Sequence, residues 1–170
     1  LFAITNMLTI EAQEKDHSTE NNPFFLPYNT PYKVPPFNLI KNEHFKPAIT
    51  QGIKLHQAQI DTIANNTAQP TFENTILAME NAGEFLSNVN VVFSNLNSAN
   101  TNEVLQNIAK EVAPILASHS DNIYLNEKLF ARVKTLWDKK DSLNLNLEQA
   151  KILDNQYKAF LLSLGNHVGA

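Results

Sequence analysis

The sequence contains no cysteine and only four glycines among its 170 residues. Without thiols, the chain cannot form disulfide bonds, bind zinc through cysteine or use a cysteine nucleophile. Five of its eight prolines fall between Pro23 and Pro36, so few residues interrupt a helix in the rest of the chain. A chain of this length can bury about two-thirds of its unfolded surface in one core. These absences favour a single, mainly α-helical domain.

Positive charge and long hydrophobic runs are scarce as well. Arg132 is the only arginine, the lysines are dispersed, and the formal net charge is −4. A surface that binds phosphates is therefore not expected, which argues against a nucleic-acid partner. No stretch reaches the roughly 20 apolar residues that a membrane-spanning helix needs, so we expect no membrane span.

Residues 1–21 form a leader with several interpretations. The opening LFAITNMLTIEAQEKD is apolar enough to be the remnant of a secretory signal peptide, with Ala12 as a small residue near its end. The polar Thr5, Asn6 and Thr9 weaken that interpretation, and a terminal helix or a disordered leader is the alternative. A helix that docks on a membrane or partner is disfavoured, because its apolar face is short and lacks basic residues. Export predicts a periplasmic location, and its absence a cytoplasmic one.

Residues 22–41 predict an extended arm. Their five prolines remove backbone donors and push the preceding residues towards extended geometry, so no α-helix can persist. The arm also contains more aromatic residues than a solvated linker, so some of them should be buried. We expect the arm to act as a strap over its own helices; the alternative is a peptide-like segment that binds another protein. The aromatic residues are Phe24, Phe25, Tyr28, Tyr32 and Phe37.

From residue 42 onwards, apolar residues recur at helical spacing. The pattern predicts about six helices with short connections, which makes residues 42–170 an all-α helical bundle preceded by the arm. The six stripes are Phe45, Ile49, Ile53, Ile60 and Ile63; Ile76 and Met79; Phe85, Val89, Val92 and Leu96; Val104, Leu105, Ile108, Val112, Ile115 and Leu116; Leu129, Phe130, Val133, Leu136 and Trp137; and Ala150, Leu153, Tyr157, Phe160, Leu161 and Leu164.

Polar residues, glycine and proline predict where these helices begin, bend and end. Pro114 should kink or break the fourth helix near Lys110, and the ASHSDN stretch should be a turn. The expected N-terminal caps are Thr71, Thr101 and Asn126, together with a capping box of Asn146 and Gln149. The expected ends are Asn65 and Asn66, a left-handed Gly83, and Gly165.

The residues show no catalytic or metal-binding pattern. The polar stretch QPTFENTILAMENAG is explained as a capped short helix. His56 with Gln59 is the nearest pair at helical spacing, and a hydrogen bond on the helix surface is its expected role. Glu103 and Glu111 show no matching acid for paired-carboxylate catalysis. The histidines lack any zinc-ligand spacing, so we predict no catalytic, cofactor-binding or metal-binding residues in this chain.

Five stretches carry a resemblance to a known family, in order and with family-like spacing. They are NPFFLPYNTPYKVPPFNLIKNEHFKPAI, PTFENTI, VFSNLNSANTNEVLQ, SDNIYLNEKLFARV and LEQAKILDNQYKAF. From about Asn22 to its end, the chain resembles the N-terminal region of bacterial peptidyl-dipeptidases and oligopeptidase A, in the thimet oligopeptidase family of zinc metallopeptidases. One departure is HQAQI, where Gln59 stands in place of an expected acidic residue; it removes a surface charge and puts no mechanism in doubt.

The resemblance implies a helical clam-shell enzyme whose two halves enclose a channel for short peptides. The peptidyl-dipeptidases of the family release dipeptides from a free C-terminus, and an H-E-x-x-H motif with a later glutamate holds their zinc. This chain stops before those elements, so we expect a fragment that walls the channel and is inactive alone. Its expected partners are the catalytic domain of the same polypeptide, short peptides, and a second copy through the exposed interdomain face. The alternative is a stand-alone helical module that binds peptides or proteins without catalysis.

Overall fold

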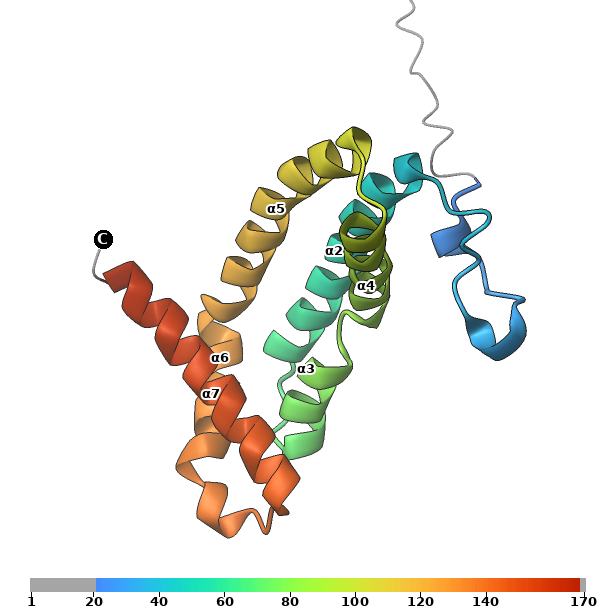
Figure 1. Cartoon of the computed structure of the whole chain (residues 1–170). Coiled ribbons are helices and arrows are strands. Elements are labelled where there is room, and N and C mark those ends of the chain that lie inside the picture. The colour runs from blue at the N-terminus through green and yellow to red at the C-terminus, as the bar shows by residue number, and fades with distance from the viewer. Residues whose placement is uncertain (1–20, 169–170) are drawn as a thin grey trace, which may run out of the picture.

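The structure, a computed structural model, describes residues 21–168, with side chains described as far as Gly165. Within that range the chain forms helices and no strands, which confirms the predicted all-α fold (Figure 1). None of the helices described there is long and apolar enough to cross a membrane. The α-helices are α2 (Phe45–Ala64), α3 (Ala78–Asn81), α4 (Glu84–Ala99), α5 (Glu103–Tyr124), α6 (Glu127–Asp138) and α7 (Leu147–Val168). Short 3-10 turns span Pro23–Phe25, Pro31–Lys33, Asn42–His44 and Lys140–Ser142, and a π-helical turn spans Phe72–Leu77.

Two separate hydrophobic clusters lie along α2, one near each end of that helix. The first half of α2 packs with α4, the start of α5 and the base of the arm, and its second half packs with α3, α6 and α7. The buried members of the first cluster are Phe24, Phe45, Ala48, Ile49, Leu86, Val89, Val92, Phe93, Leu105 and Val112. Those of the second are Ile60, Ile63, Ala64, Phe72, Ile76, Met79, Ile123, Leu129, Val133, Leu136, Leu153 and Phe160.

Most of the predicted apolar positions are buried or half-buried, and four are exposed, Ala150 among them. Val104, Ile115 and Leu161 are 53%, 43% and 45% exposed, although the spacing assigned them to the buried stripes. A helix stripe gives only the direction in which a side chain points. Whether another element covers that direction depends on the tertiary arrangement.

The helix boundaries follow the expected caps with two corrections. Thr71 and Asn126 cap the helices that follow them, and Asn146 and Gln149 form the predicted capping box with hydrogen bonds of 2.9 and 3.1 Å. The cap of α5 is Asn102, whose side chain accepts from the amide of Leu105, rather than the predicted Thr101. Helix α7 continues past Gly165, so the predicted stop there is wrong.

Helix α5 corrects a third prediction, because it runs unbroken through Pro114 and the ASHSDN stretch. Pro114 is exposed, so the carbonyl one turn earlier that loses its hydrogen bond can be solvated. Val112 packs in the first cluster and Ile123 in the second, with buried His119 between them. Contacts at both ends therefore favour one continuous helix over the predicted break and turn.

The arm follows the strap prediction only at its base. Phe24 is buried against Phe45 with ring centroids 5.4 Å apart, and Phe25 stacks on Phe85 at 5.8 Å. The remainder of the arm projects from the helices as a loop (Figure 1), and its Tyr32 is 98% exposed. The predicted strap is therefore wrong for most of residues 26–39, although Tyr28 is half-buried there and Ile40 packs on the first cluster again.

The stretch PTFENTI contains a compact network of hydrogen bonds between side chains and the backbone. Thr71 and Asn74 cap each other, because each side-chain oxygen accepts from the other residue's backbone amide at 3.1 and 2.9 Å. The Asn74 side chain also donates to the Gln69 carbonyl at 2.9 Å and accepts from the Thr75 hydroxyl at 2.9 Å. The capped helix predicted here begins as the π-helical turn Phe72–Leu77 before α3 continues it. These polar groups thus start a helix and are not a catalytic set.

Arg132 of α6 adds four hydrogen bonds to this network. Its guanidinium donates to the carbonyls of Asn66 and Ala68 at 2.6 and 3.1 Å. It also donates to the Asn74 amide oxygen at 2.8 Å and the Thr75 hydroxyl at 3.1 Å. Arg132 is only 7% exposed, and its four hydrogen-bond partners are neutral oxygens. Burial lowers its pKa, yet a guanidinium stays charged at neutral pH because its ordinary pKa is so high.

Replacing Arg132 should therefore destabilise the bundle strongly. Arg132→Met removes the donors from four partly or fully buried oxygens, and we expect it to lower the free energy of unfolding by about 3 kcal/mol. Lys128→Met is the matched control, because Lys128 also reaches from α6 to this loop, at Asn65, but through an exposed 2.8 Å hydrogen bond. The control should change stability by less than about 0.5 kcal/mol. Urea unfolding of both variants checks this, and equal losses would contradict it.

Candidate functional site

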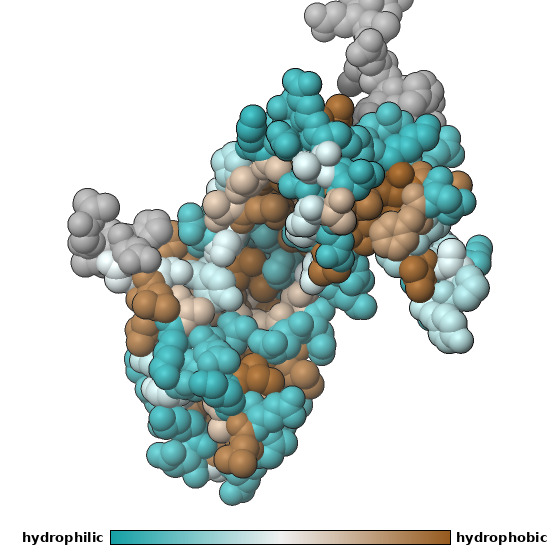
Figure 2. All heavy atoms as spheres, viewed as in Figure 1, coloured by the Kyte–Doolittle hydropathy of each residue, from teal (hydrophilic) through white to brown (hydrophobic). Residues whose placement is uncertain are grey.

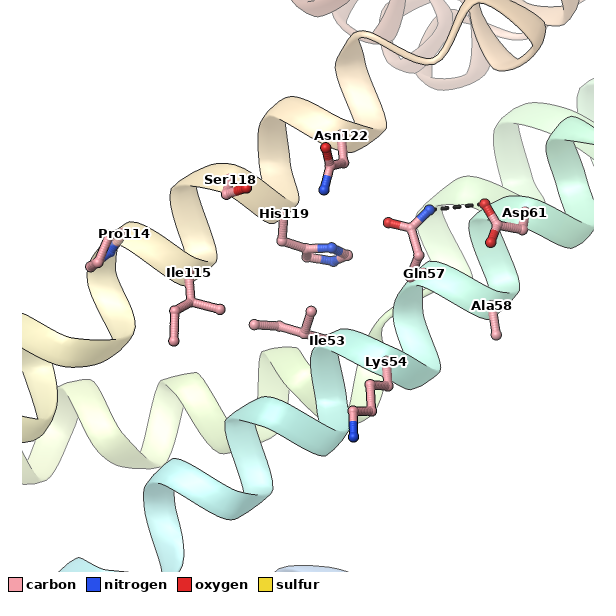
Figure 3. A pocket seen from close by; sticks show the side chains of 10 residues that line it. All are labelled: Ile53, Lys54, Gln57, Ala58, Asp61, Pro114, Ile115, Ser118, His119 and Asn122. Atoms are coloured by element: carbon pink, nitrogen blue, oxygen red, sulfur yellow. Dashed lines mark hydrogen bonds between the residues drawn. The ribbon is translucent and has the colours of Figure 1, made fainter.

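An open recess lies between α2 and α5, at the level where one hydrophobic cluster ends and the other begins. This α2–α5 groove has a cavity volume of about 660 Å³. Figure 2 shows a hollow on this face of the molecule, and Figure 3 shows the lining side chains converging from the two helices. The groove is lined by Ile53, Lys54, Gln57, Ala58 and Asp61 from α2 and by Pro114, Ile115, Ser118, His119 and Asn122 from α5.

The groove has an apolar end and a polar end. Ile53 and Ile115 face each other across it near Pro114, while Gln57, Asp61 and Asn122 gather at the other end (Figure 3). The Gln57 amide donates to the Asp61 carboxylate at 2.9 Å, which orients both groups along α2. An open recess of this kind can hold an apolar side chain at one end and hydrogen-bond a backbone or a charged group at the other. Among its ten lining residues, no hydroxyl is hydrogen-bonded to a base.

A pair of histidines joins α2 to α5 beside the groove. His56 Nδ1 and His119 Nε2 are 3.1 Å apart, and the two rings meet edge to face with centroids 4.9 Å apart. One of these two nitrogens carries a hydrogen and donates the hydrogen bond, and the other nitrogen accepts it. His119 is 6% exposed and lies between the residues of α5 that enter the two clusters. This hydrogen bond is therefore a polar contact between α2 and α5, and it lies between the two hydrophobic clusters.

The His56 ring is also fixed from the other side, by the turn between α3 and α4. Gly83 has a left-handed φ of 76°, as predicted, and a Cβ at this position would come within 2.7 Å of His56 Nδ1. The Gln59 side chain accepts a hydrogen bond from the Gly83 amide at 2.8 Å, and this bond connects the same turn to α2. Only glycine combines the required φ with space for the imidazole. A glutamate at position 59 could accept the same bond, so the departure in HQAQI leaves this contact intact.

The residues singled out in the sequence take different positions from those expected. His56 and Gln59 do not bond to each other on the helix surface; each makes its own contact with another element. Glu111 pairs with Lys46 at 2.6 Å, so its carboxylate takes part in an exposed salt bridge. The His56–His119 pair was missed because its members are 63 residues apart and no local pattern connects them.

The described residues do not fit the zinc that the family resemblance implies. Within residues 21–168, no group of three or more histidine, cysteine, aspartate or glutamate side chains converges on one point. His56 and His119 come nearest, but their facing nitrogens are bonded to each other. A zinc site needs at least three protein ligands, which the described residues do not bring together.

The described residues form a helical bundle with an open groove, and comparison with known proteins shows that the chain is similar to the N-terminal region of a group of bacterial peptidases. Dipeptidyl carboxypeptidase of Escherichia coli (strain K12) is 39% identical over 145 residues, which cover 85% of this chain and 21% of the relative. Oligopeptidase A of Salmonella typhimurium (strain LT2) is 28% identical over 137 residues, which cover 81% of this chain and 20% of the relative. No protein-family model matches the chain.

These matches confirm the resemblance predicted from the sequence. The chain spans about a fifth of the length of the curated relatives that it matches. The two motifs most typical of the family, PTFENTI and SDNIYLNEKLFARV, meet in the structure where Arg132 contacts Asn74 and Thr75. The motif residues that we can place thus hold the bundle together and do not form a catalytic centre.

The His56–His119 pair should make the stability of the folded chain depend on pH. Burial lowers the pKa of both histidines, and the neighbouring His119 lowers that of His56 further. In the window below the ordinary pKa of about 6.5, the unfolded chain therefore binds more protons than the folded one. The stability should be fully present above pH 6.5 and should be lost as the pH falls through the folded pKa values.

Urea unfolding between pH 7.5 and pH 5 checks this prediction. The free energy of unfolding of the unmodified chain should fall across this range, and His119→Gln should reduce the fall because glutamine can hydrogen-bond His56 without titrating. His17→Gln is the control, since it removes a titrating group outside the pair. An identical pH profile for the chain and His119→Gln would show that the pair does not govern this stability.

Proposed function

We propose that this chain is the N-terminal helical domain of a zinc-dependent peptidyl-dipeptidase, an enzyme that releases dipeptides from the C-terminus of short peptides. The observation that carries the proposal is the 39% identity with a dipeptidyl carboxypeptidase across 85% of this chain. The identity is higher than that with the oligopeptidase A proteins, at 28% to 29%, which favours a peptidyl-dipeptidase. The zinc and its H-E-x-x-H motif would lie in the remaining polypeptide.

In this proposal the α2–α5 groove forms part of the wall of the peptide channel. Three features support that role: the groove is open, its apolar and polar ends match the alternation of side chains and backbone in a peptide, and it holds no catalytic set. The fixed His56–His119 and Gln59–Gly83 contacts keep its walls in place. A rigid wall can select peptides by size and shape without taking part in the cleavage.

The alternative is a stand-alone helical module that binds peptides or proteins in the same groove. The reading frame distinguishes the two proposals. A frame that continues past Ala170 into an H-E-x-x-H motif supports the peptidase domain, and a stop codon at that point supports the module.

We expect the 170-residue chain alone to release no dipeptides. Purified chain is incubated with zinc and a short peptide that has a free C-terminus, and the products are followed by mass spectrometry. The complete polypeptide serves as the positive control under the same conditions. Zinc-dependent release by the short chain that persists after further purification would contradict the proposal that the zinc site lies in the remaining polypeptide.

Filling the groove should change the peptide preference of the complete enzyme. Ile115→Trp enlarges a 43% exposed side chain at the apolar end, so it should narrow the groove with little loss of core packing. We expect kcat/KM to fall about tenfold for peptides long enough to reach the groove, which corresponds to about 1.4 kcal/mol, and to change little for the shortest substrates. Val104→Trp is the matched control, because Val104 is 53% exposed on the same helix outside the groove. An equal effect of both variants would rule out a role for the groove.

A further inference from the structure

The projecting part of the arm, residues 26–39, is an exposed apolar surface that we call the arm tip. Lys33 is its only charged residue. In Figure 2, hydrophobic atoms gather on the side of the molecule that carries the arm. An apolar protrusion of this kind is more typical of a contact surface than of a solvated loop. Tyr28 of the arm tip is half-buried. The exposed large apolar side chains of the arm tip are Leu26, Tyr32, Val34, Phe37 and Leu39, which are 58%, 98%, 46%, 51% and 57% exposed.

The base of the arm is held firmly, so the tip is presented in a defined place. The Asn22 side chain donates to the His44 carbonyl at 2.8 Å and accepts the Phe24 amide at 3.1 Å. Asn22 is 1% exposed, and its bond to His44 closes the loop where the chain enters α2. Where the loop returns to the helices, the amide of Lys41 donates a hydrogen bond to His44 Nδ1 at 3.1 Å. Both ends of the loop are therefore fixed to the start of α2.

The tip itself has an unusual backbone. Tyr32 and Lys33 have φ angles of 57° and 56°, in the left-handed region that residues with a side chain rarely adopt. Such a conformation is strained for a residue with a Cβ, and it persists where surrounding contacts support it. The Lys33 amide bonds the Thr30 carbonyl at 3.0 Å, and the Thr30 hydroxyl bonds the Val34 carbonyl, so the turn is closed locally. The Tyr32 side chain, however, gains almost no contact within the described chain.

Prolines make the arm tip stiff as well as exposed. Pro27, Pro31, Pro35 and Pro36 fix four φ angles within residues 26–39. A segment that is already ordered loses little conformational entropy when it binds, so even a small contact can be favourable. An ordered, apolar and strained turn that presents a tyrosine has the properties of a binding element.

The size of the surface indicates the kind of partner. Five side chains cannot supply the roughly 800 Å² per partner that stable complexes between separate proteins bury. A partner on the same polypeptide needs less area, because the linkage raises its effective concentration to the millimolar range. The relatives have about four-fifths of their length outside the region that this chain matches. That additional polypeptide is the partner that the observations favour.

We propose that the arm tip docks into an apolar pocket on the polypeptide that makes up the rest of the enzyme, with Tyr32 as the side chain that enters it. The inference rests on the proposed function, since it requires that this polypeptide exists. Docking would provide the contacts that Tyr32 lacks and would fix the base of α2, and thereby one wall of the groove, relative to the rest of the enzyme. The base of α2 is the point to which Asn22 and His44 attach the arm.

Hydrogen exchange measured by mass spectrometry tests the proposal. The exchange rate of residues 26–39 is compared between the 170-residue chain and the complete polypeptide encoded by the gene. We expect exchange to be at least tenfold slower in the complete polypeptide. Tyr32→Asn should restore the faster rate there, because asparagine tolerates the left-handed conformation but cannot fill an apolar pocket. In the short chain the same variant should leave the melting temperature unchanged or raise it.

Leu147→Asn is the matched control, because Leu147 is 93% exposed but lies outside the arm. It should leave the exchange of the arm unchanged in both proteins. Equal exchange rates in the chain and the complete polypeptide would overturn the proposal. So would slow exchange that appears in the short chain only at high concentration, since that result identifies a second copy as the occupant. Dipeptide release by a complete polypeptide whose arm exchanges rapidly would refute the docking alone and leave the proposed function standing.

Discussion

The buried guanidinium of Arg132 is the interaction on which the arrangement of this bundle depends. It gathers four oxygens from the segment between α2 and α3, a segment that has no regular hydrogen bonding of its own before Thr71. A charged donor buried among neutral acceptors stabilises the fold only while all of those acceptors remain in place. Arg132 therefore fixes the position of α6 relative to the end of α2. Because α5 and α7 pack on α6 and on each other, their positions follow from the same contact.

The groove exists because the bundle has two hydrophobic clusters instead of one. Helix α2 contributes to both clusters, and α5 also reaches both, so the two helices approach each other at both ends. Between the clusters they are joined by the His56–His119 hydrogen bond, which satisfies two polar groups without filling the space beside them. A continuous apolar interface at this level would have closed the groove. A polar contact at the centre of the bundle thus leaves room for a ligand.

The family motifs acquire a physical meaning from these contacts. PTFENTI supplies two of the four acceptors and SDNIYLNEKLFARV supplies the guanidinium, so the two stretches are joined directly although they lie about 50 residues apart. Likewise NPFFLPYNTPYKVPPF divides into a base that packs on α2 and α4 and a tip whose large apolar side chains are mostly exposed. The first part stabilises this domain, and the second is the part available for contact with other polypeptide. The same short motif thus contains one part that is packed in the described fold and one part that is exposed.

The sequence by itself determined the helical class, the six helical segments, most of the caps and most of the buried positions. These features depend on spacing and on the chemistry of single residues or near neighbours, such as Thr71 with Asn74 or Asn146 with Gln149. The tertiary structure alone decided the partners of Arg132, the pairing of His56 with His119 and the exposure of Tyr32. It also decided the continuity of α5, where packing at both ends outweighed the local signal of Pro114. Contacts between residues that are distant in the chain depend on how whole helices pack, and no local pattern encodes that packing.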